Sequence, residues 1–175
     1  MSAASGVPGD PGPAAAPAPT APLRPLLQEI YLQDLVEGLY GVYLVRLRDD
    51  TARRVIAAYL QAESDRRLRL TRFLEDRGVR PGARVRRLFA GAGSLYGRAT
   101  AWLGTRVMLR IAASSSRRAS RGACAALGRA TSPDFLYFAS LRARNVGDLL
   151  QDLEQHLIDT APRRDTRTGR RPGPV

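Results

Sequence analysis

Apolar residues recur at helical spacing along most of this chain, and nowhere do they alternate with polar residues as a half-buried strand requires. A first helix is predicted from Pro25 to Arg48, with the proline suited to its first turn. A second helix is predicted to begin after a cap at Asp49 or Asp50 and to end at Gly78. Their short connection makes the two helices antiparallel neighbours. The pattern therefore predicts an all-α fold.

The middle of the chain is predicted to be an amphipathic, glycine-rich segment from Val85 to about Ser116, continued by a polar helix from Arg117 to Ala130. Its longest run without a charge covers ten residues, Leu88 to Gly97. A helix that crosses a bilayer takes about 20 residues, so this segment is not expected to span a membrane. Two last helical stretches are predicted at 135–144 and 146–160.

Composition divides the chain into one folded domain, 24–161, and two tails, 1–23 and 162–175. The first tail is rich in Pro, Ala, Gly and Ser, and the second in Arg, Pro, Gly and Thr. Such sequences bury too little apolar area to offset the entropy lost on ordering. We therefore predict that both tails are disordered.

Charge is distributed unevenly along the chain, which has a formal net charge of +12. No Asp or Glu lies between Asp76 and Asp134, although that stretch contains twelve arginines. Such a block attracts phosphate on lipid headgroups or nucleic acid, or an acidic protein. A solvated, arginine-rich surface is the alternative. The residues predicted to contact a membrane or another anion are Arg84, Arg86, Arg87, Arg98, Trp102, Arg106 and Arg110.

The segment around Trp102 combines an apolar face with a tryptophan and flanking arginines. This combination is typical of a helix that lies in the plane of a membrane interface. An ordinary core helix, with small residues for close packing, is the alternative.

The single cysteine, Cys124, excludes an internal disulfide, and the N-terminus has no apolar run typical of a secretory signal. We therefore expect a cytoplasmic location, peripheral to the inner face of the membrane.

Several short motifs carry a resemblance to a known family. They are Val36-Glu37-Gly38-Leu39-Tyr40-Gly41-Val42, Glu63-Ser64-Asp65-Arg66-Arg67-Leu68, Phe73-Leu74-Glu75-Asp76-Arg77-Gly78-Val79-Arg80-Pro81, and Gly91-Ala92-Gly93 followed by Leu103-Gly104. In these motifs and their order, residues 26–160 resemble the demethoxyubiquinone hydroxylase family. The resemblance implies a ferritin-like, membrane-associated bundle in which a di-iron site hydroxylates a quinone precursor of ubiquinone biosynthesis.

Most of the metal ligands that the resemblance implies are missing. Leu39 stands where the first helix would offer a Glu. Glu63 is followed three residues later by Arg66 instead of His, and a guanidinium has no lone pair for a metal. The third metal-bearing helix would fall in the carboxylate-free block, and on the last helix His156 is preceded by Leu153 instead of Glu.

Glu63 and His156 are therefore the metal-ligand candidates that remain, and two ligands are too few for a di-iron centre. A weak mononuclear site that adds Asp152 or Glu154 is one alternative. Ordinary roles are the other: an internal salt bridge to an arginine for Glu63, and a helix-surface pair or a boundary position for His156.

The leading hypothesis is a ferritin-like, peripheral membrane protein that needs no cofactor and serves as a binding or scaffold protein. Its predicted partners are an anionic membrane surface and a hydrophobic, quinone-like ligand or a partner protein, and it is open whether the chain forms a homo-oligomer. One alternative is an active hydroxylase that binds iron. The other is a basic helical protein that binds nucleic acid.

Overall fold

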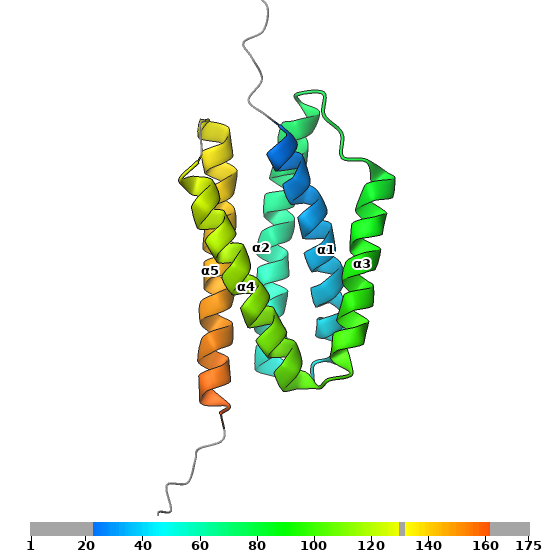
Figure 1. Ribbon diagram of the computed structural model, residues 1–175, viewed down its shortest axis with the longest axis vertical. Helices are drawn as coiled ribbons and strands as arrows, with labels where there is room; N and C mark the ends of the chain where they lie inside the picture. The colour runs from blue at the N-terminus through cyan, green and yellow to red at the C-terminus, as the bar shows by residue number, and fades with distance from the viewer. Residues whose placement is uncertain (1–22, 130–131, 162–175) are drawn as a thin grey trace, which may run out of the picture.

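The computed structural model describes residues 23–129 and 132–161. These residues form five α-helices and no strand (Figure 1). The helices are α1 (Arg24–Arg46), α2 (Asp50–Glu75), α3 (Ala83–Ala101), α4 (Thr105–Leu127) and α5 (Pro133–Asp159). The prediction of an all-α fold is confirmed. Apart from Leu23, the predicted tails lie outside the described residues.

The ends of α1 and α2 follow from local chemistry that the sequence already contained. Pro25 lies in the first turn of α1. The Asp49 carboxylate accepts a hydrogen bond from the Ala52 N–H at 3.0 Å, so Asp49, not Asp50, caps α2. Beyond α2, Gly78 adopts a positive φ of 75°, and the chain turns away there.

The predicted boundaries in the second half of the chain are wrong. The segment 85–116 is not continuous, because the chain turns at Gly104, whose φ is +88°. The helix that follows, α4, continues through Ser116 to Leu127. The two predicted last helices form one helix, α5: no proline interrupts it, and the Asn145 side chain binds Glu63 instead of competing for its own backbone.

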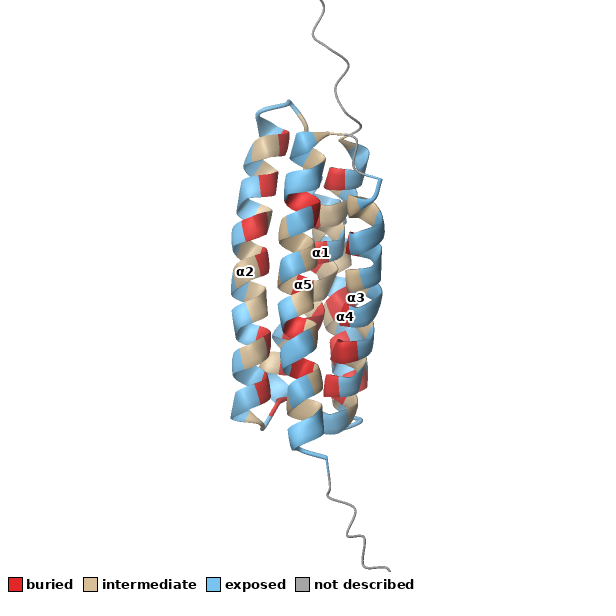
Figure 2. Cartoon of the chain, turned by 90° about the vertical axis from the view of Figure 1, so that its left-hand side faces the viewer, coloured by how far each residue is buried: buried red, intermediate tan, exposed pale blue. Residues whose placement is uncertain are grey.

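Four of the five helices share the core. The larger cluster of buried apolar residues joins α1, α2, α4 and α5 and consists of Leu39, Tyr40, Tyr43, Leu47, Ala52, Ile56, Met108, Leu109, Ala112, Ala113, Leu149 and Leu153. A smaller cluster joins α1, α2 and α5 and consists of Leu26, Ile30, Leu70, Leu74 and Phe138. The buried residues of α3 are only Gly93, Gly97 and Thr100, and most of its other residues are exposed. On α2, by contrast, the buried residues lie on the side that faces the other helices (Figure 2). The fold is therefore a four-helix core with α3 packed on its outside.

Glycines bring α3 against α1. A Cβ atom added to Gly93 would lie 1.9 Å from the Leu35 carbonyl oxygen, and one added to Gly38 would lie 2.2 Å from the Ala90 carbonyl oxygen. Neither position has room for a methyl group, so the two backbones are in direct contact. The inner face of α3 therefore consists mainly of small residues, and its large side chains Leu88 and Leu95 are exposed.

We predict that Gly93→Ala destabilises the protein, since the new methyl group meets backbone that cannot move aside without separating the helices. Overpacking of this kind typically costs about 1–3 kcal/mol. Gly91→Ala is the matched control, because Gly91 is exposed on the same helix and an added Cβ has nothing within 4 Å. It should stabilise the protein by up to about 1 kcal/mol through helix propensity. Urea denaturation measures both changes, and equal effects would contradict the direct backbone contact.

Candidate functional site

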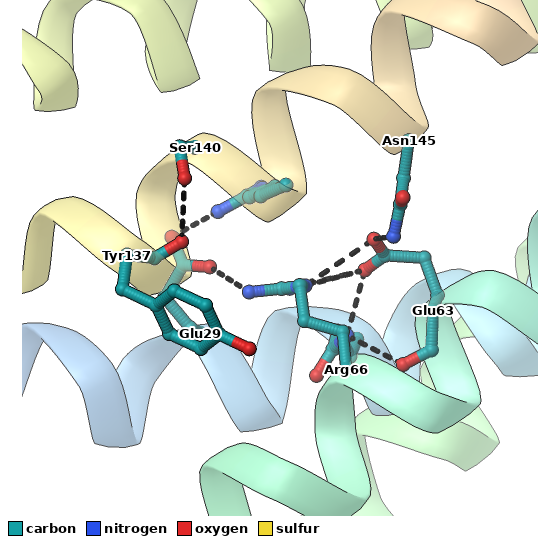
Figure 3. Close-up of polar contacts among 8 residues, drawn as sticks. Glu29, Glu63, Arg66, Tyr137, Ser140 and Asn145 are labelled. Atoms are coloured by element: carbon teal, nitrogen blue, oxygen red, sulfur yellow. Dashed lines mark hydrogen bonds and ion pairs between the residues drawn. The ribbon is translucent and has the colours of Figure 1, made fainter. Parts of the chain in front are cut away.

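An arginine lies between two carboxylates inside the bundle, where the resemblance leads us to expect metal ligands. Glu63 and Arg66 of α2 are 4% and 2% exposed. The Arg66 guanidinium donates to Glu63 Oε2 at 3.0 Å and to Glu29 Oε2 of α1 at 3.1 Å (Figure 3). Burial disfavours its charged form, but the Glu63 and Glu29 carboxylates outweigh burial and raise the pKa of Arg66. The site therefore holds a fixed positive charge.

Three helices supply the donors that satisfy Glu63. Gln33 of α1 donates from Nε2 to Glu63 Oε2 at 2.6 Å, and Asn145 of α5 donates from Nδ2 to Glu63 Oε1 at 2.8 Å. On the other side of the site, Arg142 of α5 forms an ion pair with Glu29. Glu63 is thus bound by one guanidinium group and two side-chain amides, and Glu29 by two guanidinium groups, which leaves both carboxylates poorly placed to bind a metal.

The structure does not bring the two metal-ligand candidates together. Glu63 lies in this internal network, whereas the His156 Nε2 atom lies 2.7 Å from Asp49 Oδ2, near the turn between α1 and α2. Glu154 instead binds Arg117 of α4 at 2.6 Å. Among residues 23–129 and 132–161, no group of three or more His, Cys, Asp or Glu side chains could hold a metal ion.

The sequence analysis missed Glu29, Gln33, Arg142 and Asn145 as members of this network. One signal was available: Gln33 follows Leu26 and Ile30 at helical spacing, so it lies on the buried face of α1. Its partners could not be found in the same way, because the spacing within one helix does not say which residues of another helix lie opposite.

A second ion-pair cluster fixes α3 to the core. The buried Asp34 carboxylate of α1 binds Arg86 of α3, with Nε at 2.9 Å and Nη2 at 3.0 Å, and binds Arg67 of α2 at 3.2 Å. The hydrogen bond to Asp34 raises the pKa of Arg86. Arg86 was predicted to contact a membrane or another anion, but its side chain is instead bound within the protein.

The outer face of α3 carries a stripe of exposed apolar residues, which we call the α3 stripe: Leu88, Ala92, Leu95, Ala99 and Trp102. The exposed fractions of its three large members, Leu88, Leu95 and Trp102, are 70%, 70% and 89%. Residues at this spacing lie on one side of a helix. Of the seven residues predicted to contact a membrane or an anion, all except Arg86 are exposed. They lie on α3, on α4 and in the turn between these helices: Arg84, Arg87, Arg98, Trp102, Arg106 and Arg110.

A small cleft of about 140 Å³ opens between α2 and α5. Its floor is apolar and includes Tyr59 and Leu149, and the carboxylates of Asp148 and Asp152 lie at its rim. Burial, together with the Glu63 carboxylate, raises the pKa of Tyr59 well above its ordinary value, so its phenol is neutral. The cleft can therefore accept a small apolar group beside acidic side chains.

Within residues 23–129 and 132–161, none of the helices has the length and the apolar composition that a membrane span requires. Comparison of the chain with models of protein families, with curated proteins and with solved structures finds no match in any of the three. The likeness to the demethoxyubiquinone hydroxylases is therefore carried by the sequence motifs alone.

We predict that Arg66→Met destabilises the bundle by about 3–5 kcal/mol, because it leaves buried carboxylates without their counter-charge. Arg72→Met is the matched control on the same helix, since Arg72 is exposed; its effect should stay within about 0.5 kcal/mol. Adding Glu63→Gln to Arg66→Met should recover part of the loss, because the partners are coupled. Chemical denaturation measures all three variants, and a loss no greater for Arg66→Met than for Arg72→Met would contradict the buried ion pair.

Asp49 gives a prediction about pH. The Ala52 N–H lowers the pKa of this carboxyl below its ordinary value of 3.8; burial opposes the shift and His156 supports it. The stabilisation by Asp49 is therefore present above that pH and is lost as the pH falls through the lowered pKa. Asp49→Ala should cost about 1 kcal/mol at neutral pH. Urea denaturation should show a smaller difference from the parent protein at about pH 2.5.

Asp49→Asn is the control for this experiment, because asparagine also caps helices but carries no charge. It should cost less than Asp49→Ala at neutral pH. If the cost of Asp49→Ala were the same at both pH values, the carboxylate would not be the stabilising group.

Proposed function

We propose that this protein is a peripheral membrane-binding scaffold, which attaches to anionic bilayers through large apolar side chains exposed on α3 and next to it, and through the arginines near them. The observation that carries the proposal is the orientation of α3. This helix buries its glycines and exposes Leu88, Leu95 and Trp102. Exposed apolar side chains aligned on one face, with polar residues beside them, mark a surface that binds another apolar phase or partner.

The charges beside the stripe favour an anionic bilayer as that partner. Arg84, Arg87 and Arg98 are exposed on α3, and none of them forms an ion pair within the described residues. Each basic side chain near an anionic surface contributes about 1 kcal/mol to binding. Because α3 contains no acidic residue, a second copy of this helix offers no counter-charge to these arginines, which disfavours a homo-oligomer built on this face.

The internal arginine supports a scaffold instead of an oxygenase. We propose that the bundle is ferritin-like and that Arg66 supplies, between Glu29 and Glu63, the positive charge that a metal would supply in an active hydroxylase. The proposed ligand site for a quinone-like ring is the cleft beside Tyr59, whose floor is apolar. Metal analysis of the purified protein separates the two functions, because an active hydroxylase would contain two irons per chain.

We predict that the protein floats with vesicles that contain anionic phosphatidylglycerol, more weakly with purely zwitterionic vesicles, and less at high salt because screening weakens the arginine contacts. The triple variant Arg98→Gln, Arg106→Gln, Arg110→Gln, at exposed positions near Trp102, should bind anionic vesicles about 100-fold more weakly. The matched control removes the same charge from exposed positions on α2 and α5, as Arg69→Gln, Arg72→Gln, Arg144→Gln, and should bind as the parent does.

Equal affinity of the parent protein for both kinds of vesicle, or equal losses in the two triple variants, would contradict the proposal. Strong salt-dependent binding to DNA or RNA without binding to vesicles would favour the nucleic-acid alternative. Light scattering of the free protein tests for the homo-oligomer.

A further inference from the structure

One end of the bundle gathers five helix ends and two turns. In Figure 1, α1, α3 and α5 end at the lower end of the molecule, where α2 and α4 begin. Three contacts between neighbouring elements fix this end. The Tyr43 hydroxyl of α1 lies 2.8 Å from the Thr100 hydroxyl of α3, Arg106 of α4 donates to the Thr160 carbonyl oxygen at 3.3 Å, and His156 binds Asp49.

Large apolar side chains project from this end, and we call them the apolar tip. Their exposed fractions are 83% for Val45, 89% for Trp102, 61% for Leu103 and 67% for Ile158. Val45 comes from α1, Trp102 and Leu103 come from the turn between α3 and α4, and Ile158 comes from α5. Only Trp102 also belongs to the α3 stripe, so a bilayer lying along α3 would not explain the exposure of Val45 and Ile158.

Exposed basic side chains lie at the same end of the bundle as the apolar tip: Arg46, Arg48 and Arg106. The acidic side chains there have partners within the chain. Asp49 caps α2 and binds His156, Asp50 forms an ion pair with Arg53 at 3.0 Å, and Asp159 accepts a hydrogen bond from Gln155 Nε2 at 2.9 Å. Exposed cations around an apolar surface match the negatively charged headgroups of a bilayer.

The backbone of the turn suits contact with lipid. The Leu103 N–H donates to the Thr100 carbonyl oxygen at 3.1 Å, and the Gly104 N–H donates to the Ala101 carbonyl oxygen at 3.4 Å. Because these amide groups are already bonded inside the chain, moving the turn away from water leaves fewer of them unsatisfied.

We infer that the apolar tip inserts into an anionic bilayer, so that the bundle stands with its long axis steep to the membrane instead of lying on α3. This inference rests on the proposed membrane binding and specifies its orientation. Leu88, at the other end of the α3 stripe, lies about 21 Å from Trp102 along the helix axis. Each interfacial region of a bilayer is about 5–8 Å thick, so a steep orientation leaves Leu88 outside the membrane.

Tryptophan fluorescence tests the inference, because Trp102 is the only tryptophan of the chain. The parent protein is mixed with phosphatidylcholine and phosphatidylglycerol vesicles that contain lipids brominated on the acyl chains, which quench tryptophans in the bilayer. On a Trp102→Phe background, three variants each move the probe: Val45→Trp, Ile158→Trp and Leu88→Trp. We expect quenching of the probes at 102, 45 and 158 and none at 88.

A second measurement compares a glutamate placed at the apolar tip with a glutamate placed far from it. Ile158→Glu should weaken vesicle binding at least about tenfold, because a carboxylate at the tip would have to enter the interface. Leu68→Glu is the matched control, because Leu68 is 52% exposed on α2 and lies far from the apolar tip. It should change binding less than about twofold, the small electrostatic effect of one exposed charge. Circular dichroism confirms that each variant is folded.

The outcomes separate this inference from the proposed function. Quenching at 88 and 102, but not at 45 and 158, would show that the protein binds along α3, which overturns the inference and keeps membrane binding. Flotation of none of the folded proteins would overturn the proposed function itself. Quenching at the three tip positions, together with a loss of binding in Ile158→Glu alone, would support the steep orientation.

Discussion

Two carboxylates of α1, Glu29 and Asp34, determine how the other helices are placed. Each binds two arginines from other helices: Arg66 and Arg142 for Glu29, and Arg67 and Arg86 for Asp34. Apolar contact has little directional preference, whereas a guanidinium presents its donors in a fixed plane. These pairs therefore specify that α2, α5 and α3 surround α1, and the apolar clusters then stabilise that arrangement.

The same arrangement places the arginines in two different environments, one inside the bundle and one on its surface. Inside, positive charge is matched by carboxylates and shielded from water, as for Arg66 with Glu63. Outside, the arginines of α3 stand beside apolar side chains that are largely exposed. The first arrangement stabilises a fold, and the second suits an anionic, partly apolar surface. Both come from a chain whose basic residues are all arginine.

Sequence predicted features that depend on neighbours within one helix. The ends of α1 and α2 were predictable because Pro25, Asp49 and Gly78 act locally. The exposure of Arg84, Arg87 and Arg98 followed from the lack of acidic neighbours. Features that depend on distant partners were not predictable. Arg86 meets Asp34 across 52 positions, and Asn145 meets Glu63 across 82. The turn at Gly104 was missed because glycine also occurs inside helices of this chain, as at Gly93 and Gly97.

The glycine contact between α1 and α3 has a consequence for how this protein can change over time. Because no large side chain of α3 is fully buried, substitutions at Leu88, Leu95 or Trp102 leave the packing of the other four helices intact. The outer face of α3 can thus acquire a different affinity or a different target without a loss of folding stability. Adaptation of the surface and maintenance of the scaffold are independent in this molecule.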